Sequence, residues 1–329
     1  MLELSVNLEK NRRENQMDNY KFVRVSEENL FQLVSLYRES FNSKVSVDFL
    51  KKKFDTAAFG SAYIGFLALD NKTDEPAGYY GVFPLLAQIE GKEILVAQSG
   101  DTMTHPKHQG KGLFTELAKK TYILAQEQGI KFVFGFPNKN SFPGFKKKLN
   151  WQFYSDINNY TIKTGVLPFD KLAKKISFLK PLHEIFIKIR LKKYTLNSEF
   201  SNSLQKQQNT HGFIIHDAVF FLYKSYYNSF TVKIENVWCS LKIDGRLWVG
   251  DIDHCEKSQF FKVIEGLFTL AKAIGCSSVH LSLTNETLYD HYMKEKYVLL
   301  GKDPIGYINF DDSINPSKFA YNAIDFDTY

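Results

Sequence analysis

Ten consecutive residues, His-Pro-Lys-His-Gln-Gly-Lys-Gly-Leu-Phe at positions 105–114, combine glycines with basic side chains where a predicted strand meets a predicted helix. The first turn of a helix leaves backbone N–H groups unpaired and carries partial positive charge. Gly110 and Gly112 would let a diphosphate approach that backbone closely, and Lys111 would add a charge beside it. The segment is typical of a phosphate-binding turn, although an ordinary glycine-rich turn has the same composition. It is neither a Walker loop nor Gly-x-Gly-x-x-Gly.

The spacing of apolar residues predicts the elements that hold this turn. Gly129 is a suitable C-terminal cap for the helix that follows it. In chain order we expect a strand over 20–26, helices near 30–37 and over 47–54, strands over 62–69, 77–89 and 93–104, a helix over 110–128, a strand over 132–136, a short helix ending near 149 and a strand from 151.

In this setting Pro106-x-x-Gln109-x-x-Gly112 resembles motif A of the GNAT N-acetyltransferase superfamily, whose pattern is Gln/Arg-x-x-Gly-x-Gly/Ala. The order of elements over residues 20–164 is also that family's order. The resemblance implies an acetyl-CoA site in which the backbone amides of residues 110–114 hold the pyrophosphate and the strand ending near Thr104 pairs with the pantetheine arm. Phe114 replaces the usual Gly or Ala, so its side chain must point into the packing face of the helix. The cofactor-binding residues implied are Met103, Thr104, Gln109, Gly110, Lys111, Gly112, Leu113, Phe114, Asn138, Ser141 and Phe145.

A second match follows the strand over 132–136. GNAT proteins often carry Asn there, a small residue three positions on, and a general-acid Tyr four beyond that, where this chain has Asn138, Ser141 and Phe145. Asn138 is expected either to orient the acyl donor or to cap the following helix. Phe145 has no hydroxyl, so the acid that reprotonates the departing thiolate must come from elsewhere. Tyr154 is the first candidate and Tyr160 the second.

Direct transfer also needs a group that accepts the proton of the attacking amine. Asp101, just before the end of the predicted strand, is the best candidate base, and Glu93, farther upstream, is a weaker one. The alternative role for Asp101 is that of a turn or cap residue. His105 and His108 belong to a residue type that titrates near neutrality, but flanking or surface roles are expected for both.

The second half repeats the predicted elements of the first. A helix over 260–274 ends at Gly275, a strand over 279–283 follows, and Asn285, Leu288 and Tyr292 repeat the spacing of the earlier Asn, Ser and Phe. The strand over 247–252 leads to an acidic segment without the glycine motif, and carboxylates there would repel a diphosphate. We predict a degenerate GNAT-like domain that does not bind CoA and that forms the acceptor pocket or a dimer interface. Chance similarity between two α/β segments is the alternative.

The length of 329 residues predicts two domains. We divide the chain into an N-terminal extension (1–19), an acetyl-CoA-binding GNAT domain (20–165), a basic amphipathic connector (166–200) and the degenerate GNAT-like domain (201–329). The fold class expected is α/β (α+β), a mixed, mostly antiparallel sheet flanked by helices, duplicated. The connector, interrupted by Pro181, is interpreted either as a helix packed on one domain or as a contact for a membrane surface or an anionic acceptor.

Composition limits the remaining classes. Hydrophobic residues make up 44% and charged residues 24%, as in soluble globular proteins, and a net charge of +6 is small for a nucleic-acid-binding protein. No apolar run is long enough for a membrane span, and the N-terminus lacks the apolar core of a signal peptide. Three scattered cysteines predict free thiols in a reducing cytoplasm, with no zinc site.

The leading hypothesis is therefore transfer of an acetyl group from acetyl-CoA to a primary amine of a small molecule, with amino sugars among the candidates. One alternative is a non-catalytic acyl-CoA-binding or scaffold protein, suggested by Phe145. Another is a tandem-GNAT ligase that uses aminoacyl-tRNA to modify peptidoglycan, against which the intact motif counts.

Overall fold

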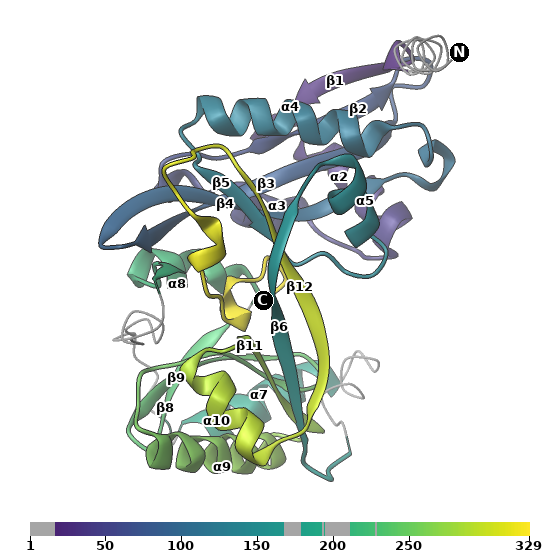
Figure 1. The fold of residues 1–329 in the computed structure, drawn as a ribbon. Coiled ribbons are helices and arrows are strands. Elements are labelled where there is room, and N and C mark those ends of the chain that lie inside the picture. The colour runs from purple at the N-terminus through teal and green to yellow at the C-terminus, as the bar shows by residue number, and fades with distance from the viewer. Residues whose placement is uncertain (1–16, 168–178, 193, 195–210, 228) are drawn as a thin grey trace.

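The computed structural model describes residues 17–167, 179–192, 194, 211–227 and 229–329, and within them twelve strands form one continuous sheet (Figure 1). The elements of the first half are β1 (Tyr20–Arg24), α2 (Leu30–Phe41), α3 (Val47–Phe54), β2 (Ile64–Asp70), β3 (Pro76–Ile89), β4 (Lys92–Thr104), α4 (Leu113–Glu127), β5 (Phe132–Gly135), α5 (Phe142–Lys148) and β6 (Gln152–Lys163). Those of the second half are α7 (Leu179–Leu191), β7 (Gly212–Ile214), α8 (Ala218–Lys224), β8 (Phe230–Ile234), β9 (Val237–Ile243), β10 (Leu247–Ile252), α9 (Lys257–Ala273), β11 (Ser278–Thr284), α10 (Leu288–Lys296) and β12 (Leu299–Asn309).

The sheet is mostly antiparallel and runs β1-β2-β3-β4-β5-β12-β6-β11-β10-β9-β8, with β7 added to β3. Two strand pairs are parallel, β4 with β5 and β10 with β11. Parallel neighbours need a crossover connection, and α4 and α9 supply the two crossovers. This mixed sheet with flanking helices confirms the predicted fold class.

The two halves repeat the same order of elements and exchange their last strands. The series β8-β9-β10-α9-β11-α10-β12 matches β2-β3-β4-α4-β5-α5-β6, including the parallel pair on either side of the long helix. However, β12 lies between β5 and β6, and β6 lies between β12 and β11. Figure 1 shows these two long strands crossing from one half to the other. A duplicated GNAT-like domain stays a proposal, and the shared strands tie the two halves together whatever its origin.

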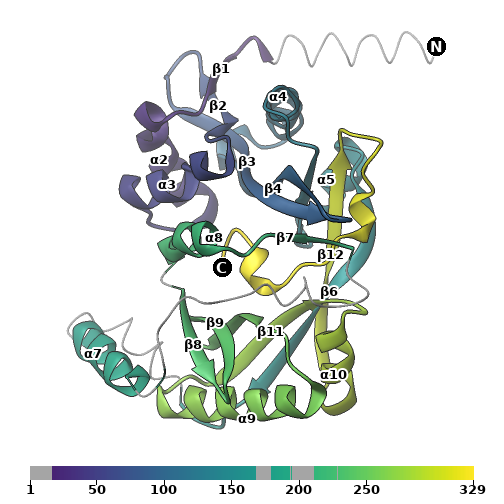
Figure 2. The same cartoon turned by 90° about the vertical axis from the view of Figure 1, so that its left-hand side faces the viewer.

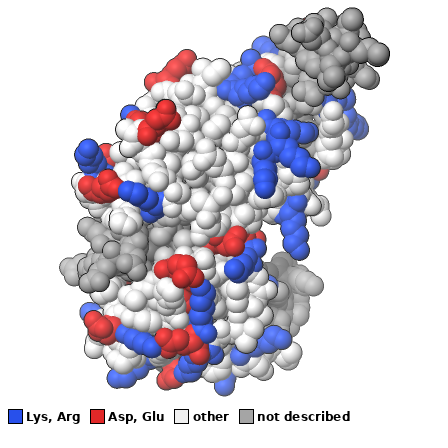
Figure 3. Space-filling view, viewed as in Figure 1, with Lys and Arg blue, Asp and Glu red and all other residues white. Residues whose placement is uncertain are grey.

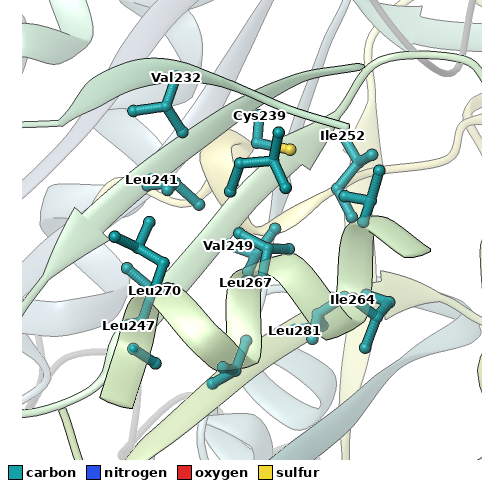
Figure 4. Packing of buried hydrophobic residues seen from close by; sticks show 14 of the residues in the cluster. Val232, Cys239, Leu241, Leu247, Val249, Ile252, Ile264, Leu267, Leu270 and Leu281 are labelled. Carbon is teal, nitrogen blue, oxygen red and sulfur yellow. The ribbon is translucent and has the colours of Figure 1, made fainter. Parts of the chain in front are cut away.

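Helices cover both faces of the first half and one face of the second. Successive residues of a strand face opposite sides, so Tyr80 of β3 packs under α4 while Tyr79 packs under α2 and α3. In the second half, apolar residues of β9, β10 and β11 meet one side of α9 (Figure 4). The opposite face of β10 and β11 is turned toward the C-terminal segment.

The C-terminal segment after β12 returns to the centre of the molecule. Figures 1 and 2 both show the C-terminus between the two halves. Phe319, Tyr321 and Tyr329 are buried in a core that also contains residues of β3, β5 and β6. The segment is therefore a structural part of both halves.

Most predicted elements of the first half are found within a few residues of their predicted bounds, and the helix over 47–54 matches α3. Pro181 does not interrupt its helix as expected, because it lies in the first turn of α7, where a missing N–H leaves no helical hydrogen bond unmade. Residues 1–16 of the predicted extension and residues 168–178, 193 and 195–200 of the predicted connector lie outside the described residues. The three cysteines are free and buried. Among the described residues no helix is long and apolar enough to cross a membrane.

Candidate acyl-donor site

The turn before α4 has the backbone conformation that its glycines predict. Gly110 and Gly112 have φ angles of 76° and 88°, in the left-handed region where a side chain is strained. Added Cβ atoms would meet nothing within 4 Å at Gly110 and only the Met17 side chain at Gly112, so the outer face of the turn is open. Within the described part of the chain, the backbone N–H groups of residues 110–114 have no hydrogen-bond acceptor. A diphosphate has room and donors at this position.

Phe114 points into the protein, as its position requires. Its ring packs edge-on against Tyr80 and Phe145, with centroids 5.9 and 5.4 Å apart. Leu113 and Met103 are also buried in the apolar cores, so they can offer only backbone groups to a ligand. Gln109, Gly110 and Gly112, by contrast, lie on the exposed side of the turn.

Strand β4 separates from β5 close to this turn. Their parallel ladder comprises Ala97 with Val133 and Gln98 with Phe134. Beyond it, the indole of Trp151 packs against Gly135. On its other edge, β4 carries a bulge where the register with β3 shifts between Gly100 and Met103. After Gln98 the described residues of β4 have no ladder partner on β5, and the resemblance places the pantetheine arm along this edge of β4.

The side chains of Asn138, Ser141 and Phe145, which were expected near the acyl donor, all contact other parts of the protein. The Oδ1 atom of Asn138 accepts hydrogen bonds from the backbone N–H groups of Asn140 (2.9 Å) and Ser141 (3.1 Å), so Asn138 closes the turn before α5, whereas the N-cap position of that helix is occupied by Ser141. Ser141 is the residue before α5. Phe145 is buried against Trp151, with ring centroids 4.5 Å apart.

A chain of hydroxyl groups lies beside Phe145. The Tyr80 hydroxyl is 2.9 Å from Ser99 Oγ and 2.7 Å from the Tyr122 hydroxyl, which accepts a hydrogen bond from Trp151 Nε1 at 2.9 Å. Ser99 is the first β4 residue beyond the ladder with β5 and is partly exposed. Sequence reasoning missed this chain because it looked for one tyrosine at a fixed spacing after Asn138.

Asp101 lies at the β4 bulge with a φ of 51° and belongs to a buried charge cluster. Its Oδ2 atom is 2.5 Å from Lys53 Nζ of α3 and accepts a short hydrogen bond from the Tyr37 hydroxyl of α2. Asp327 Oδ2, from the C-terminal segment, is 3.3 Å from the same ammonium. Two carboxylates thus share one lysine directly under the bulge, and sequence reasoning had identified only Asp101.

Burial and charge act in opposite directions in this cluster. Burial raises the pKa of Asp101, the Lys53 ammonium lowers it and Asp327 raises it, and the net pKa lies above its ordinary value. Burial alone would lower the pKa of Lys53, but the two carboxylates more than offset this and raise it. The lysine therefore stays charged, and the cluster carries a net negative charge that favours proton uptake.

The C-terminal segment fits closely against the bulge. A Cβ atom at Gly100 would collide with the Asp327 carboxylate, so any side chain there would displace this part of the C-terminal segment. The segment is held by Lys224 Nζ, which donates to the Phe326 carbonyl at 2.6 Å, and by Lys242 Nζ, which donates to the Thr328 carbonyl at 2.6 Å.

The remaining candidates have other partners. Tyr154 donates to the Phe319 carbonyl at 2.8 Å, and Tyr160 donates to Asp290 Oδ1 at 2.7 Å in the second half. Burial raises the pKa of both hydroxyls. His108 Nδ1 is 2.9 Å from the Tyr20 hydroxyl, and Glu93 lies near the start of β4, at the opposite end from the bulge.

Positive charge gathers near the donor turn. Figure 3 shows lysine and arginine side chains over α5, the helix against which Phe114 packs. The last turn of α5 contributes Lys146, Lys147 and Lys148, all exposed. An anionic ligand approaching the open turn would therefore meet a positive surface.

A cavity of about 210 Å³ lies on the second-half side of the C-terminal segment. It is lined by Phe326, Thr328 and Tyr329 of that segment and by residues of β9, β10 and β11, including Lys242 and Trp248. Since Asp327 contacts Gly100, the segment separates this cavity from the β4 bulge.

Comparison with known proteins agrees with this architecture. Residues 21–154 match the acetyltransferase (GNAT) domain family. No curated protein matches the sequence. The fold is similar to a GCN5-related N-acetyltransferase from Kribbella flavida (TM-score 0.56, 11% identity, 89% of this chain and 71% of that chain covered). It is also similar to a putative acetyltransferase from Pyrococcus horikoshii (TM-score 0.56, 12% identity, 92% and 93% covered). The third similar structure is Saccharomyces cerevisiae N-myristoyltransferase with bound myristoyl-CoA (TM-score 0.57, 9% identity, 91% and 82% covered). The family match therefore assigns residues 21–154 to the acetyltransferase (GNAT) domain family, and the similar structures show the same fold over most of the chain.

Proposed function

We propose that the chain transfers an acetyl group from acetyl-CoA to a primary amine of a small molecule, by direct attack of the amine on the thioester. The observation that carries this proposal is the set of unpaired N–H groups at residues 110–114, which follow the part of β4 that has no ladder partner on β5. These donors would hold the pyrophosphate. The open edge of β4 would then guide the pantetheine arm toward the bulge at Asp101.

The charge cluster supports the amine side of the reaction. Attack forms a bond from nitrogen to the acyl carbon and breaks the bond from carbon to sulfur, while the nitrogen loses a proton. Asp101 and Asp327 both contact the Lys53 ammonium, so two carboxylates face one cation there and this cluster can take up that proton. The hydroxyl chain that begins at Ser99 would return a proton to the thiolate in place of the tyrosine that Phe145 replaces.

Replacing Gly110 with alanine tests the donor site. We expect acetyl-CoA affinity to fall about tenfold or more, since ~1.4 kcal/mol corresponds to tenfold and the left-handed turn would rearrange. Gly129→Ala is the matched control, because Gly129 has a similar φ of 80° and an equally open Cβ position at the other end of α4. Calorimetric titration with acetyl-CoA should show no change for the control. Equal losses in both variants would locate the effect in the stability of α4 instead of the turn.

Replacing Asp101 or Asp327 with asparagine tests the proton acceptor. For Asp101→Asn we expect turnover to fall by about 10²–10⁴-fold, the usual contribution of a general base, with acetyl-CoA affinity unchanged. Asp327→Asn should give a smaller fall, because Asp101 remains beside Lys53. The measurement is thiol release from acetyl-CoA with a panel of primary amines, including amino sugars. Turnover unchanged in both variants would remove the cluster from the mechanism.

The competing proposal is an acyl-CoA-binding protein without catalysis, and the burial of Phe145 in place of an acid is the observation that favours it. Acetyl-CoA binding without thiol release for any amine of the panel would support this alternative.

A further inference from the structure

Helix α7 presents an apolar stripe to solvent. Leu182, Ile185, Phe186 and Ile189 are 60%, 55%, 38% and 59% exposed. Their spacing of three and four residues places them within an arc of about 100° of the helix. Soluble proteins expose single apolar side chains freely, but a continuous apolar stripe on one helix face indicates a contact surface.

The same helix is anchored to the protein through its opposite side. Leu191 is buried in the core of the second half, and Ile187 packs against that core. His183 on this inner side is also buried. In Figure 2, α7 lies at the outer margin of the second half, at the left and apart from the sheet. Its solvent-facing stripe therefore lies on the side of α7 that faces away from this core.

Basic side chains flank the stripe on both sides. By helical geometry Arg190 stands next to Phe186 on one side of the apolar arc, and Lys188 and Lys192 stand beyond Ile185 on the other. All three cations are exposed, and the Arg190 guanidinium lies 5.2 Å from the Phe186 ring centroid. From residue 179 to 192 the sequence has four Lys or Arg and one acidic residue, Glu184.

We propose that α7 docks on an anionic lipid bilayer, with its apolar stripe inserted between headgroups and its cations on lipid phosphates. An apolar face bordered by lysine and arginine on both sides is the arrangement that binds at a bilayer interface. There the apolar side chains are buried below the headgroups while the cations contact anionic lipid headgroups. A protein groove would bury the stripe but would also have to pair cations on both of its sides. This surface is separate from the donor turn, so its use does not depend on the proposed function.

The test is co-sedimentation of the full chain with phosphatidylcholine vesicles that contain or lack phosphatidylglycerol. We expect binding to the phosphatidylglycerol vesicles, weakened by raised salt. Lys188→Glu/Lys192→Glu should weaken it more than about tenfold, because each cation near an anionic surface contributes several-fold to binding. Ile185→Ser/Ile189→Ser should do the same by removing the inserted groups. Lys262→Glu/Lys272→Glu is the matched control, with the same charge change on the exposed side of α9, and should change binding less than about twofold.

Three outcomes would overturn the proposal. The first is absence of binding to phosphatidylglycerol vesicles by the unaltered chain. The second is equal weakening by the α7 and α9 charge changes, which would mean diffuse attraction by the whole surface. The third is concentration-dependent self-association that Ile185→Ser/Ile189→Ser abolishes without any vesicle binding, which would make a second copy of the chain the partner. Circular dichroism of each variant verifies that it is folded.

Discussion

Replacing Lys53 with methionine is expected to lower the free energy of unfolding by about 3–5 kcal/mol, the usual cost of removing one partner from a buried ion pair. Lys53 is fully buried, and its ammonium lies 2.5 Å from the Asp101 carboxylate and 3.3 Å from that of Asp327. Methionine fills a similar volume, so packing changes little. The two carboxylates would then lose the ammonium that both of them contact, and their mutual repulsion would make it more costly to keep each of them charged and buried.

Lys224 offers a matched control for this variant. It is also a buried lysine, but burial lowers its pKa to about 7, because the attraction of Asp325 and Asp327 does not offset the lost hydration. Its Nζ donates to the Phe326 carbonyl at 2.6 Å. Lys224→Met should therefore cost at most the order of one hydrogen bond, about 0.5–1.5 kcal/mol, because it also removes the unfavourable burial of the ammonium.

Urea denaturation of the two lysine variants at neutral pH makes the comparison. Much of the loss in Lys53→Met should be recovered in Lys53→Met/Asp101→Asn/Asp327→Asn, since no unpaired buried charge remains. Equal losses in Lys53→Met and Lys224→Met would contradict the assignment of the cluster as a charged one. Failure of the triple variant to regain stability would do so as well.

The donor turn could be predicted from the sequence because its determinants are local. The left-handed conformations of Gly110 and Gly112, the start of α4 after them and the inward direction of Phe114 depend on neighbouring residues and helical spacing. The same is true of α3 and of the strand-helix-strand order around α4 and α9. The spacing of apolar side chains along the sequence predicts these helices and strands.

The charge cluster could be predicted only in part because its members are far apart in sequence. Lys53 and Asp327 are separated by 274 positions, and Tyr37 and Asp101 by 64. One local signal was available. Lys53 follows Phe49 by four residues and Leu50 by three, so it lies on the apolar side of α3, and a lysine there requires a carboxylate partner.

The exchange of β6 and β12 has no local signal. β6 follows α5 and β12 follows α10, so the two strands occupy equivalent positions in the repeat. From this order alone, each strand would be expected to pair with strands of its own half. Pairing across the halves depends on where the C-terminal segment goes after β12. That path is fixed by distant contacts, among them Phe319 on Phe132 and Tyr321 on Phe134.

The C-terminal segment is also held by a buried histidine between two carboxylates. His216 Nε2 lies 2.7 Å from Asp325 Oδ1, and Nδ1 lies 3.3 Å from Asp251 Oδ2. Burial alone would lower the pKa of His216, but Asp325 and Asp251 more than offset this and raise it to about 9. The charged histidine thus connects the C-terminal segment to β10 and to the loop before α8.

A folded-state pKa above the ordinary value means that this stabilisation is complete below about pH 6.5 and is lost as pH rises through about 9. Integrated over that window, the shift corresponds to roughly 3 kcal/mol at 1.36 kcal/mol per pKa unit. Lys224 acts in the opposite direction. Its pKa is lowered to about 7, so its unfavourable contribution shrinks as pH rises from 7 toward its ordinary value. In the unaltered protein the two effects partly cancel.

The His216 contribution is therefore expected to emerge in a Lys224→Met background. The measurement is the difference in free energy of unfolding between Lys224→Met and Lys224→Met/His216→Gln, at about pH 6 and about pH 9.5. The other groups titrate alike in both proteins, so the difference isolates His216. It should be about 3 kcal/mol smaller at the higher pH. A difference that stays constant across this range would mean that His216 is neutral in the folded protein, and the C-terminal segment would then be held by hydrogen bonds without a charge.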